Sequence, residues 1–307
     1  MVYTVTVNPS IDYVLRVPAL QLGHINRCSV GGVYAAGKGV NVSVVLKRLG
    51  VDSVATGFTA GFTGQALYRG VQDEGVQADF VHLRSGLTRI NVKVRAGEET
   101  DFNCDGPDIG ASDVELLKEK LGQVRAGDVV VFSGSVPGSL PQDIYARLIH
   151  GLSDTGAKFI VDAAGQALTD TLEYRPFLIK PNAEELGQIF SVSVSSAAQA
   201  AEYADRLRAM GAQNVLVSMG GQGAVLVDAE GGRSFAQAAQ ITPVDTVGSG
   251  DSMVAGFIAG YLLTSDLGYA LRLGSAAGGA TAAREGLADR SGIYGMLSRI
   301  GHVRAVE

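Results

Sequence analysis

The chain has 307 residues, enough for one large domain or two modest ones. Hydrophobic residues make up 46% and charged residues 18%, a balance typical of a packed globular protein and not of a disordered one. The formal net charge of −6 gives no basic footprint for nucleic acid or for an anionic membrane surface, so we expect neither as a partner. Any phosphate-binding site must therefore be basic only locally.

Two features bear on the cellular compartment. Cys28 and Cys104 are far apart and lack metal-ligand spacing, so we expect two reduced thiols. Residues 1–7 alternate like a strand and lack a basic leader, and no apolar run reaches the roughly 20 residues of a membrane helix. These features favour a cytoplasmic protein.

Taken in chain order, short apolar runs recur between longer helical patterns, which is typical of βαβ units. Helical periodicity covers 40–49, 112–124, 197–210 and 252–263, and Ser112 with Glu115 has the spacing of a capping box. Nearly all-apolar strands, as expected where helices cover both faces, are predicted at 129–132, 159–161, 177–179, 215–217 and 224–227. The predicted fold class is α/β with a mainly parallel sheet.

Three segments break this rhythm. Residues 13–17, 89–94 and 99–103 alternate apolar with polar side chains, which suits a sheet exposed on one face. We expect a small separate β-layer, which would serve as a lid or as a dimer surface.

The first candidate site lies at Gly37-Lys38-Gly39-Val40-Asn41. Together with Gly32 it misses the P-loop pattern by one residue, because Gly39 replaces the hydroxyl that would hold Mg²⁺, and we reject a P-loop. A flexible turn that carries an ammonium and an amide into a helix suits a sugar phosphate. A surface turn explains the same residues equally well.

The second candidate site follows the strand at 177–179, where open α/β sheets bind ligands. Asn182 and Glu185 are three residues apart at a predicted helix start and would lie on one face, where they could orient waters around Mg²⁺. The same pair fits a capping box, and from the residues alone that structural interpretation is preferred.

Two glycine-rich turns complete the set. Residues 220–223 lie between two predicted strands and indicate a hairpin-like turn, so a Rossmann dinucleotide site is unsupported. The segment Thr246-Val247-Gly248-Ser249-Gly250-Asp251 precedes an apolar helix, where converging N–H groups would attract a phosphate next to a carboxylate. That conjunction suggests a kinase, although Asp251 as a simple N-cap is an equal alternative.

Taken together, these segments resemble the PfkB carbohydrate kinases, the ribokinase-like family, along essentially the whole chain. The matching segments are Asn8–Asp12, Gly37–Asn41, Thr88–Lys93, Lys180–Leu186, Ser218–Ala224 and Val247–Ser252. The resemblance implies a single three-layer α/β/α kinase domain over 1–307, with a small β-sheet lid from about 11–33 and 86–105. It also implies a homodimer formed through that lid.

The resemblance also implies roles for individual residues. Asp251 would be the catalytic base, and the backbone of Gly248, Ser249 and Gly250 would form the anion hole. Residues implied for the sugar phosphate are Asp12, Arg27, Gly37, Lys38, Gly39, Asn41, Arg89, Asn91 and Asn103. Residues implied for ATP are Lys180, Asn182, Ser218, Gly220, Gly223, Thr246, Ser275 and Gly278. Glu185 would hold Mg²⁺ through water. Ala36 and Ala164 depart from the family pattern.

The implied reaction is the ATP-dependent and Mg²⁺-dependent phosphorylation of a sugar phosphate, with fructose 1-phosphate converted to fructose 1,6-bisphosphate. Tagatose 6-phosphate and fructose 6-phosphate are alternative substrates. A non-catalytic sugar-phosphate sensor and an NAD-dependent oxidoreductase are alternatives from other classes. The intact segment from Gly248 to Asp251 argues against the sensor, and the missing dinucleotide fingerprint argues against the oxidoreductase.

Overall fold

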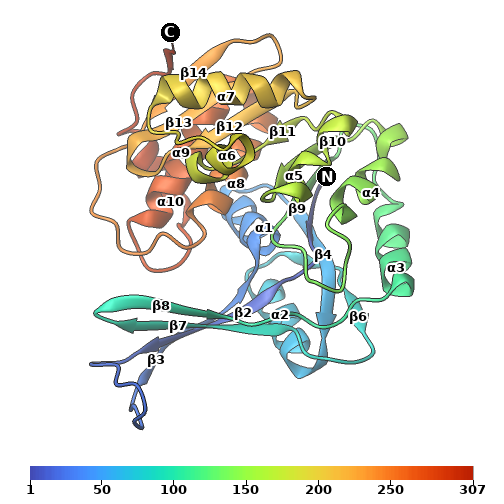
Figure 1. Ribbon diagram of the computed structural model, residues 1–307, viewed down its shortest axis with the longest axis vertical. Helices are drawn as coiled ribbons and strands as arrows, with labels where there is room; N and C mark the ends of the chain where they lie inside the picture. The colour runs from blue at the N-terminus through green and yellow to red at the C-terminus, as the bar shows by residue number, and fades with distance from the viewer. Residues whose placement is uncertain (307) are drawn as a thin grey trace.

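The computed structural model describes residues 1–306, apart from the side chains of Glu98 and Glu99. Two sheets organise this part of the chain (Figure 1). The central sheet has eleven strands within the described residues, and a separate sheet has four. The predicted α/β class, with helices on both faces of the central sheet, is confirmed.

Parallel pairs form most of the central sheet, and the antiparallel ones are confined to one end. The strand order is β15 (Arg304–Ala305), β14 (Arg233–Gln237), β13 (Gly223–Val227), β12 (Asn214–Ser218), β11 (Leu178–Ile179), β10 (Lys158–Asp162), β9 (Val129–Ser133), β1 (Val2–Thr6), β4 (Ser53–Ala60) and β5 (Gln77–Ala78), while β6 (Val81–Leu83) pairs with β4. The glycine-rich turn Gly220–Gln222 joins antiparallel β12 and β13, so the predicted hairpin-like turn is confirmed.

Successive side chains of one strand enter opposite hydrophobic layers. On β9, Val130 and Phe132 belong to one buried cluster, whereas Val129 and Val131 belong to the other. The first layer is covered by α3 (Ala111–Leu121), α4 (Ile144–His150), α5 (Gln166–Thr169), α6 (Ala183–Phe190) and α7 (Ala197–Ala209). The second is covered by α1 (Lys38–Leu49), α8 (Ser249–Thr264), α9 (Leu267–Ala282) and α10 (Arg290–Leu297). This two-sided burial explains the nearly all-apolar strands.

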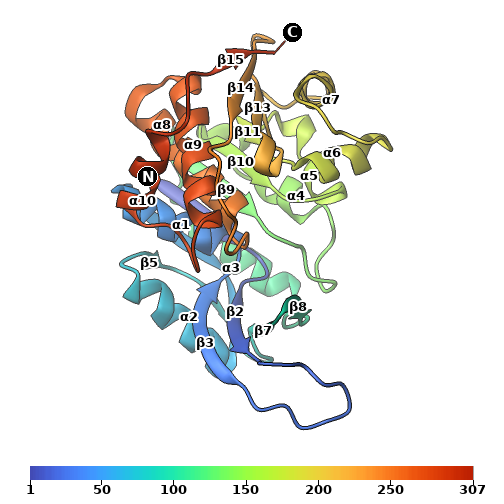
Figure 2. The same cartoon turned by 90° about the vertical axis from the view of Figure 1, so that its left-hand side faces the viewer.

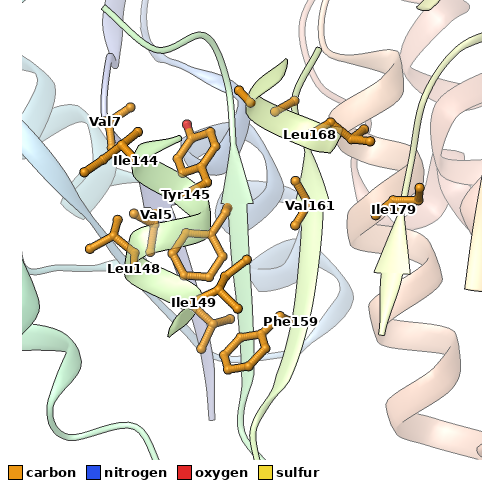
Figure 3. Packing of buried hydrophobic residues seen from close by; sticks show 14 of the residues in the cluster. Val5, Val7, Ile144, Tyr145, Leu148, Ile149, Phe159, Val161, Leu168 and Ile179 are labelled. Carbon is orange, nitrogen blue, oxygen red and sulfur yellow. The ribbon is translucent and has the colours of Figure 1, made fainter. Parts of the chain in front are cut away.

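Figure 3 shows the packing of the first layer, in which α4 lies against the sheet. Tyr145, fully buried on this helix, donates its hydroxyl to the carbonyl oxygen of Ser133 at 3.0 Å. That bond satisfies the one polar atom of a large side chain and holds α4 at the carboxyl end of β9.

The four-stranded sheet projects from the core (Figure 1) and is called the lid sheet below. Its strands are β3 (Ser29–Ala36), β2 (Ser10–Arg16), β7 (Arg89–Ala96) and β8 (Glu98–Asn103), in that order. The segment 17–28, between β2 and β3, protrudes at the bottom of Figure 2. The predicted alternating β-layer is therefore present, while the extent of the kinase domain stays a prediction.

One helix start differs from the sequence analysis. Helix α3 begins at Ala111 after the N-cap Gly110, and Asp113 accepts a hydrogen bond from the Gly110 N–H at 2.9 Å. Ser112 therefore lies inside the first turn and is not the predicted cap. The carboxylate of Asp113, placed three residues after Gly110, completes the turn instead of Glu115.

Helix α2 (Gly61–Asp73) packs beside β3 and β4.

Candidate active site

The carboxyl ends of neighbouring parallel strands bring polar side chains to one edge of the central sheet. Ser133 ends β9, Asp162 ends β10, and Lys180 follows β11. Ser133 and Asp162 are register partners, so their side chains lie on the same face. Helices α1 and α8, whose first residues are Lys38 and Ser249, contribute Lys38 and Asp251 to the same place.

Glycines allow the first turn of α1 to approach β1. Gly37 has a φ of 118°, and a Cβ on Gly39 would lie 2.4 Å from Thr6 Oγ1 and 3.0 Å from Ser133 Oγ. A hydroxyl-bearing residue has no room at position 39. The departure from the P-loop pattern is thus explained by close helix-to-strand packing.

Asp162 joins two lysines that come from distant parts of the chain. Its Oδ1 lies 2.9 Å from Lys38 Nζ and 3.3 Å from Lys180 Nζ. Asp162 is fully buried and Lys180 is 4% exposed. Burial opposes the charged carboxylate, but the two ammonium groups outweigh it and lower the pKa of Asp162. For Lys38, burial acts against the cation, yet the carboxylates of Asp162 and Asp251 raise its pKa.

Asp251 lies in the first turn of α8, where it is 6% exposed. Its Oδ2 accepts a hydrogen bond from Asn41 Nδ2 at 2.7 Å. Burial, with the negative charge of Asp162 nearby, raises the pKa of Asp251 to about 6. A carboxylate with this pKa is ionised at neutral pH and accepts a proton more readily than an ordinary aspartate.

The turn before α8 has the geometry expected of an anion site. Gly248 adopts a left-handed conformation with a φ of 76°, and the ideal Cβ position of Gly250 is 3.3 Å from Lys180 Nζ. The Ser249 N–H donates to Thr246 O at 3.2 Å, so it is already occupied. The N–H groups of Gly250 and Asp251 belong to the helix turn that lacks intrahelical acceptors. These donors and Lys180 share one side of the site.

The lid sheet carries the residues predicted for the sugar. Asp12 Oδ1 accepts hydrogen bonds from Ser10 Oγ at 2.8 Å and from Asn91 Nδ2 at 3.0 Å. Asn91 is the register partner of both Asp12 and Asn103, so the three residues form a row across β2, β7 and β8. Arg89 Nε donates to the Asn8 carbonyl at 3.2 Å, and burial lowers the pKa of this guanidinium.

A cleft of about 860 Å³ connects the lid sheet to the core. Asp12 and Lys93 line it from the lid, and Asn41 and Val247 line it from the core. Asp251 is not among the lining residues, but its partner Asn41 is. The candidate base is therefore bonded to a residue that lines the cleft.

The Asn182 and Glu185 pair forms the capping box that the residues alone favoured. Asn182 Oδ1 accepts from the Glu185 N–H and Glu185 Oε2 accepts from the Asn182 N–H, each at 2.8 Å. Asn182 also forms a bridge with Ser218, which places the start of α6 beside the end of β12. The cap leaves Glu185 Oε1 for a water or an ion.

The other residues predicted for ATP have mixed surroundings. Thr246 is exposed. Ser275 and Gly278 lie on α9, and a Cβ on Gly278 would be 3.0 Å from Ser249 O, so this helix packs tightly against the start of α8. A Cβ on Gly223 would meet Ala236 O at 2.1 Å, which requires glycine in the turn, whereas the space at Gly220 is open.

Arg27 lies apart from the other residues predicted for the sugar phosphate. It is exposed on the 17–28 segment and lines a shallow hollow with Arg16, Cys28 and Arg95. The cleft that Asp12 and Asn41 line does not include it. Within one chain, the structure does not bring Arg27 to the candidate site.

The sequence analysis assigned no role to Asp162, although this carboxylate links both halves of the site. The signal was a single acidic residue directly after the apolar run Phe159–Val161. Charged residues are almost never fully buried unless they are paired, so an acid at the carboxyl end of a central strand indicates a partner.

Residues 5–291 match the model of the pfkB family carbohydrate kinases. The chain belongs to this family. The chain is also similar to 1-phosphofructokinase from Bacillus subtilis (strain 168), which is 40% identical over 98% of each chain. D-tagatose-1-phosphate kinase from Bacillus licheniformis is 36% identical, again over 98% of each chain. Among solved structures, phosphofructokinase-2 from Escherichia coli superposes with a TM-score of 0.91 at 28% identity, covering 97% of this chain and 98% of the other.

Membership of the pfkB family confirms the resemblance seen in the sequence. The chain is a sugar kinase that transfers a phosphoryl group to a hydroxyl, with ATP as the donor. In the described part of the chain, no helix combines the length and hydropathy needed to span a membrane.

Proposed function

We propose that the chain is a 1-phosphofructokinase in which Asp251 is the catalytic base. One observation carries the assignment of the base. A buried carboxylate, with its pKa raised to about 6, lies in the first turn of α8 next to backbone donors and two lysines. That combination supplies a proton acceptor and a place for a phosphoryl group within one turn of helix.

The reaction follows from this arrangement. The primary alcohol of the sugar phosphate gives its proton to Asp251, and its oxygen forms a bond to the γ-phosphorus while the bond to the ADP oxygen breaks. Asn41 holds the carboxylate in one orientation. Lys180 and the N–H groups of Gly250 and Asp251 stabilise the charge on the transferred group, the main task in phosphoryl transfer.

Fructose 1-phosphate is the proposed acceptor, and its C6 hydroxyl is the group phosphorylated. Relatives at 40% and 38% identity carry the name 1-phosphofructokinase. Asp12 and Asn91 would bond the sugar hydroxyls, and Arg89 would bind the phosphate that the substrate already carries. Desolvation of Arg89 favours an anionic partner there, and a guanidinium suits bidentate contact with phosphate. Tagatose 1-phosphate is a second candidate, because one relative is a kinase for that sugar.

Mg²⁺ is proposed to accompany ATP. Within the described residues no cluster of three or more metal-ligating side chains occurs, which agrees with an ion held mainly by water and substrate phosphates. The fully buried Asp162 Oδ2 has no hydrogen-bond partner, and the capping box leaves Glu185 Oε1 available. Glu185 would hold the ion through its water shell, while Asp162 stays paired with Lys38 and Lys180. The bound ion would neutralise charge on the nucleotide phosphates.

A substrate panel tests this proposal. ADP release is measured with ATP and Mg²⁺ against fructose 1-phosphate, tagatose 1-phosphate, tagatose 6-phosphate and fructose 6-phosphate. We expect the highest kcat/KM with fructose 1-phosphate. A higher kcat/KM with another sugar would change the assigned substrate but leave the assignment as a kinase unchanged. Tight sugar binding without turnover of any of the four would favour the sensor.

A homodimer through the lid sheet is proposed as well. Leu22 and Ile25 on the 17–28 segment are 87% and 95% exposed, and Val33 and Phe102 on the two edge strands are more than half exposed. Edge strands with exposed apolar side chains favour pairing with another chain. The wild-type mass by light scattering should be that of two chains, and Ile25→Lys should shift it toward one. We place this dimer in the cytoplasm, where ATP and sugar phosphates are available.

A further inference from the structure

Two arginines at the outer end of the lid sheet reach across to the core. Arg16 on β2 donates from NH2 to both carboxylate oxygens of Glu285, at 2.8 and 2.6 Å. Arg95 on β7 is the register partner of Arg16; its Nη2 lies 3.6 Å from Asp245 Oδ2 in the core, and its Nη1 lies 3.6 Å from Asp101 Oδ1 within the lid. All four side chains line the cleft that runs between lid and core. The cleft is therefore crossed by two ion pairs.

The two acidic residues lie on core segments that adjoin the anion site. Asp245 Oδ1 accepts from the Val247 N–H at 2.9 Å, just before Gly248. Glu285 is two residues before Leu287, whose Cδ2 would touch a Cβ placed on Gly248. The Val244 N–H donates to Ala282 O at 2.8 Å, which ties the two segments together. Both carboxylates therefore lie on segments that adjoin the start of α8.

We infer that these pairs form a clasp, defined as Arg16 with Glu285 and Arg95 with Asp245, that positions the lid sheet over the anion site for catalysis. The inference rests on the proposed function. Arg16 follows Asp12 by four residues on one strand, roughly 13 Å along it, and its guanidinium is engaged by Glu285. The clasp acts through Asp12 and Asn91 by fixing the distance between the lid and Asp251.

The clasp is weak enough to open in each turnover. The Arg16 and Glu285 side chains are 50% and 64% exposed, and Arg95 and Asp245 are 21% and 19% exposed. Exposed ion pairs shift an equilibrium by a few-fold at most and are screened by salt. Closure over bound substrate is therefore favoured, while product release stays possible.

Kinetics of clasp variants test the inference. We expect Arg16→Gln to raise KM for fructose 1-phosphate about 3-fold to 5-fold, the upper range for an exposed ion pair, with kcat and KM for ATP within about 2-fold of wild type. The doubly swapped variant Arg16→Glu with Glu285→Arg should recover most of the loss, because it restores an ion pair across the same gap. Wild-type KM should rise with added NaCl, and that dependence should be weaker in Arg16→Gln.

The control is Arg206→Gln on α7, which breaks an ion pair with Glu202 of similar exposure, at 53% and 54%, away from the cleft. It should leave KM unchanged. Calorimetric binding of fructose 1-phosphate with a non-hydrolysable ATP analogue gives a readout without turnover. The clasp is overturned if Arg16→Gln behaves like Arg206→Gln, or if the swap is no better than the single variants. A wild-type chain without turnover would instead overturn the proposed function, and the binding ratio would still decide on the clasp.

Discussion

Ion pairs occur both at the carboxyl edge of the central sheet and at the lid sheet, but they differ in how deeply they are buried. At the sheet edge, Asp162 is fully buried and Lys180 nearly so. Across the cleft, Arg16 of the lid and Glu285 of the core are 50% and 64% exposed. Both sets of side chains belong to the candidate kinase site. The difference in burial predicts that the core groups are fixed for chemistry, whereas the lid groups select and release the substrate.

Burying a charged side chain costs free energy, and only its full set of oppositely charged partners offsets that cost. A buried carboxylate or ammonium without its partner is strongly destabilising, while an exposed pair contributes little. Three polar chain segments meet at Asp162, and each brings its side chain on an element fixed by hydrophobic packing. The pair of Arg16 and Glu285 has no such constraint, because both side chains are at least half exposed and exchange readily with water. Variants in the two regions should therefore differ in kind as well as in size.

The largest effect is expected in the core, for Asp251→Asn. The amide cannot accept the alcohol proton, so kcat should fall by about 10²-fold to 10⁴-fold, the range for a positioned base. ATP affinity should change little, because the backbone donors remain. The comparison on the lid is Asp12→Asn, which should raise KM for the sugar phosphate more than it lowers kcat. Near-normal turnover of Asp251→Asn in the ADP-release assay would remove this residue from the mechanism.

Asp162→Asn tests the cost of the buried charges. Lys180 would lose its buried counter-charge, so the free energy of unfolding should fall by about 3–5 kcal/mol. Guanidinium unfolding monitored by circular dichroism measures this change. The matched control is Asp205→Asn, which loses ion pairs to Arg208 and Arg233 on a half-buried surface and should cost no more than about 1 kcal/mol. Equal losses in the two variants would contradict the contrast between the regions.

How far the sequence predicts this site depends on whether a residue acts within its own segment. Asp251 and Gly248 are found from one short motif, because the turn and the helix that use them are local. The Asn182 cap is local too, and the sequence favoured it correctly. Asp162 was missed because its partners, Lys38 and Lys180, come from other segments, 124 and 18 residues away along the chain. Such pairing is set by strand order, which periodicity does not reveal.

The same distinction applies to the fold. Strands β9, β10, β12 and β13 were predicted from apolar runs, and the lid strands β2, β7 and β8 from alternation, since both patterns follow from which faces are buried. The alternating segments did not include the fourth lid strand, β3. The predicted start of α3 was wrong because Gly110, which has no side chain to mark it as a cap in the sequence, is the N-cap, and Asp113 accepts its N–H. Arg27 was assigned to the sugar phosphate by resemblance. In a single chain, however, Arg27 lines a separate hollow and not the cleft.

Arg89→Gln probes the substrate side at the base of the lid. Loss of a charge-assisted contact to phosphate costs about 1.5–3 kcal/mol, so KM for the sugar phosphate should rise roughly 10-fold to 100-fold. Turnover at saturation should stay within a few-fold of wild type, since Asp251 is untouched. Arg89→Lys keeps the charge, so its KM for the sugar phosphate should lie between those of wild type and Arg89→Gln. A fall in kcat with unchanged KM would move Arg89 from binding to chemistry.

The pH profile separates the core base from groups on the lid. Because the pKa of Asp251 is raised to about 6, the fraction of ionised base falls below that pH. The value of kcat/KM should therefore drop about tenfold per pH unit below pH 6 and stay level from pH 7 to pH 8. Initial rates at low sugar concentration measure this. A profile that remains level down to pH 5 would contradict the raised pKa.

The smallest expected effect is a gain in the free energy of unfolding. It comes from Asp251→Asn, the same substitution that lowers kcat. A carboxyl whose pKa is higher in the folded chain, about 6, than its ordinary value of 3.8 favours folding when protonated. This contribution is complete below pH 3.8 and is lost as the pH rises through 6, so ionised Asp251 destabilises the fold at neutral pH. Each pKa unit corresponds to about 1.4 kcal/mol. Asp251→Asn should therefore raise the free energy of unfolding at pH 7.5 by about 1–3 kcal/mol, and Tm by a few degrees. The gain should vanish near pH 4, where wild type is also neutral at this position. A variant less stable than wild type at pH 7.5 would contradict this. It would mean that Lys38, Lys180 and Asn41 fully compensate the charge of wild-type Asp251, so that the ionised base does not destabilise the fold.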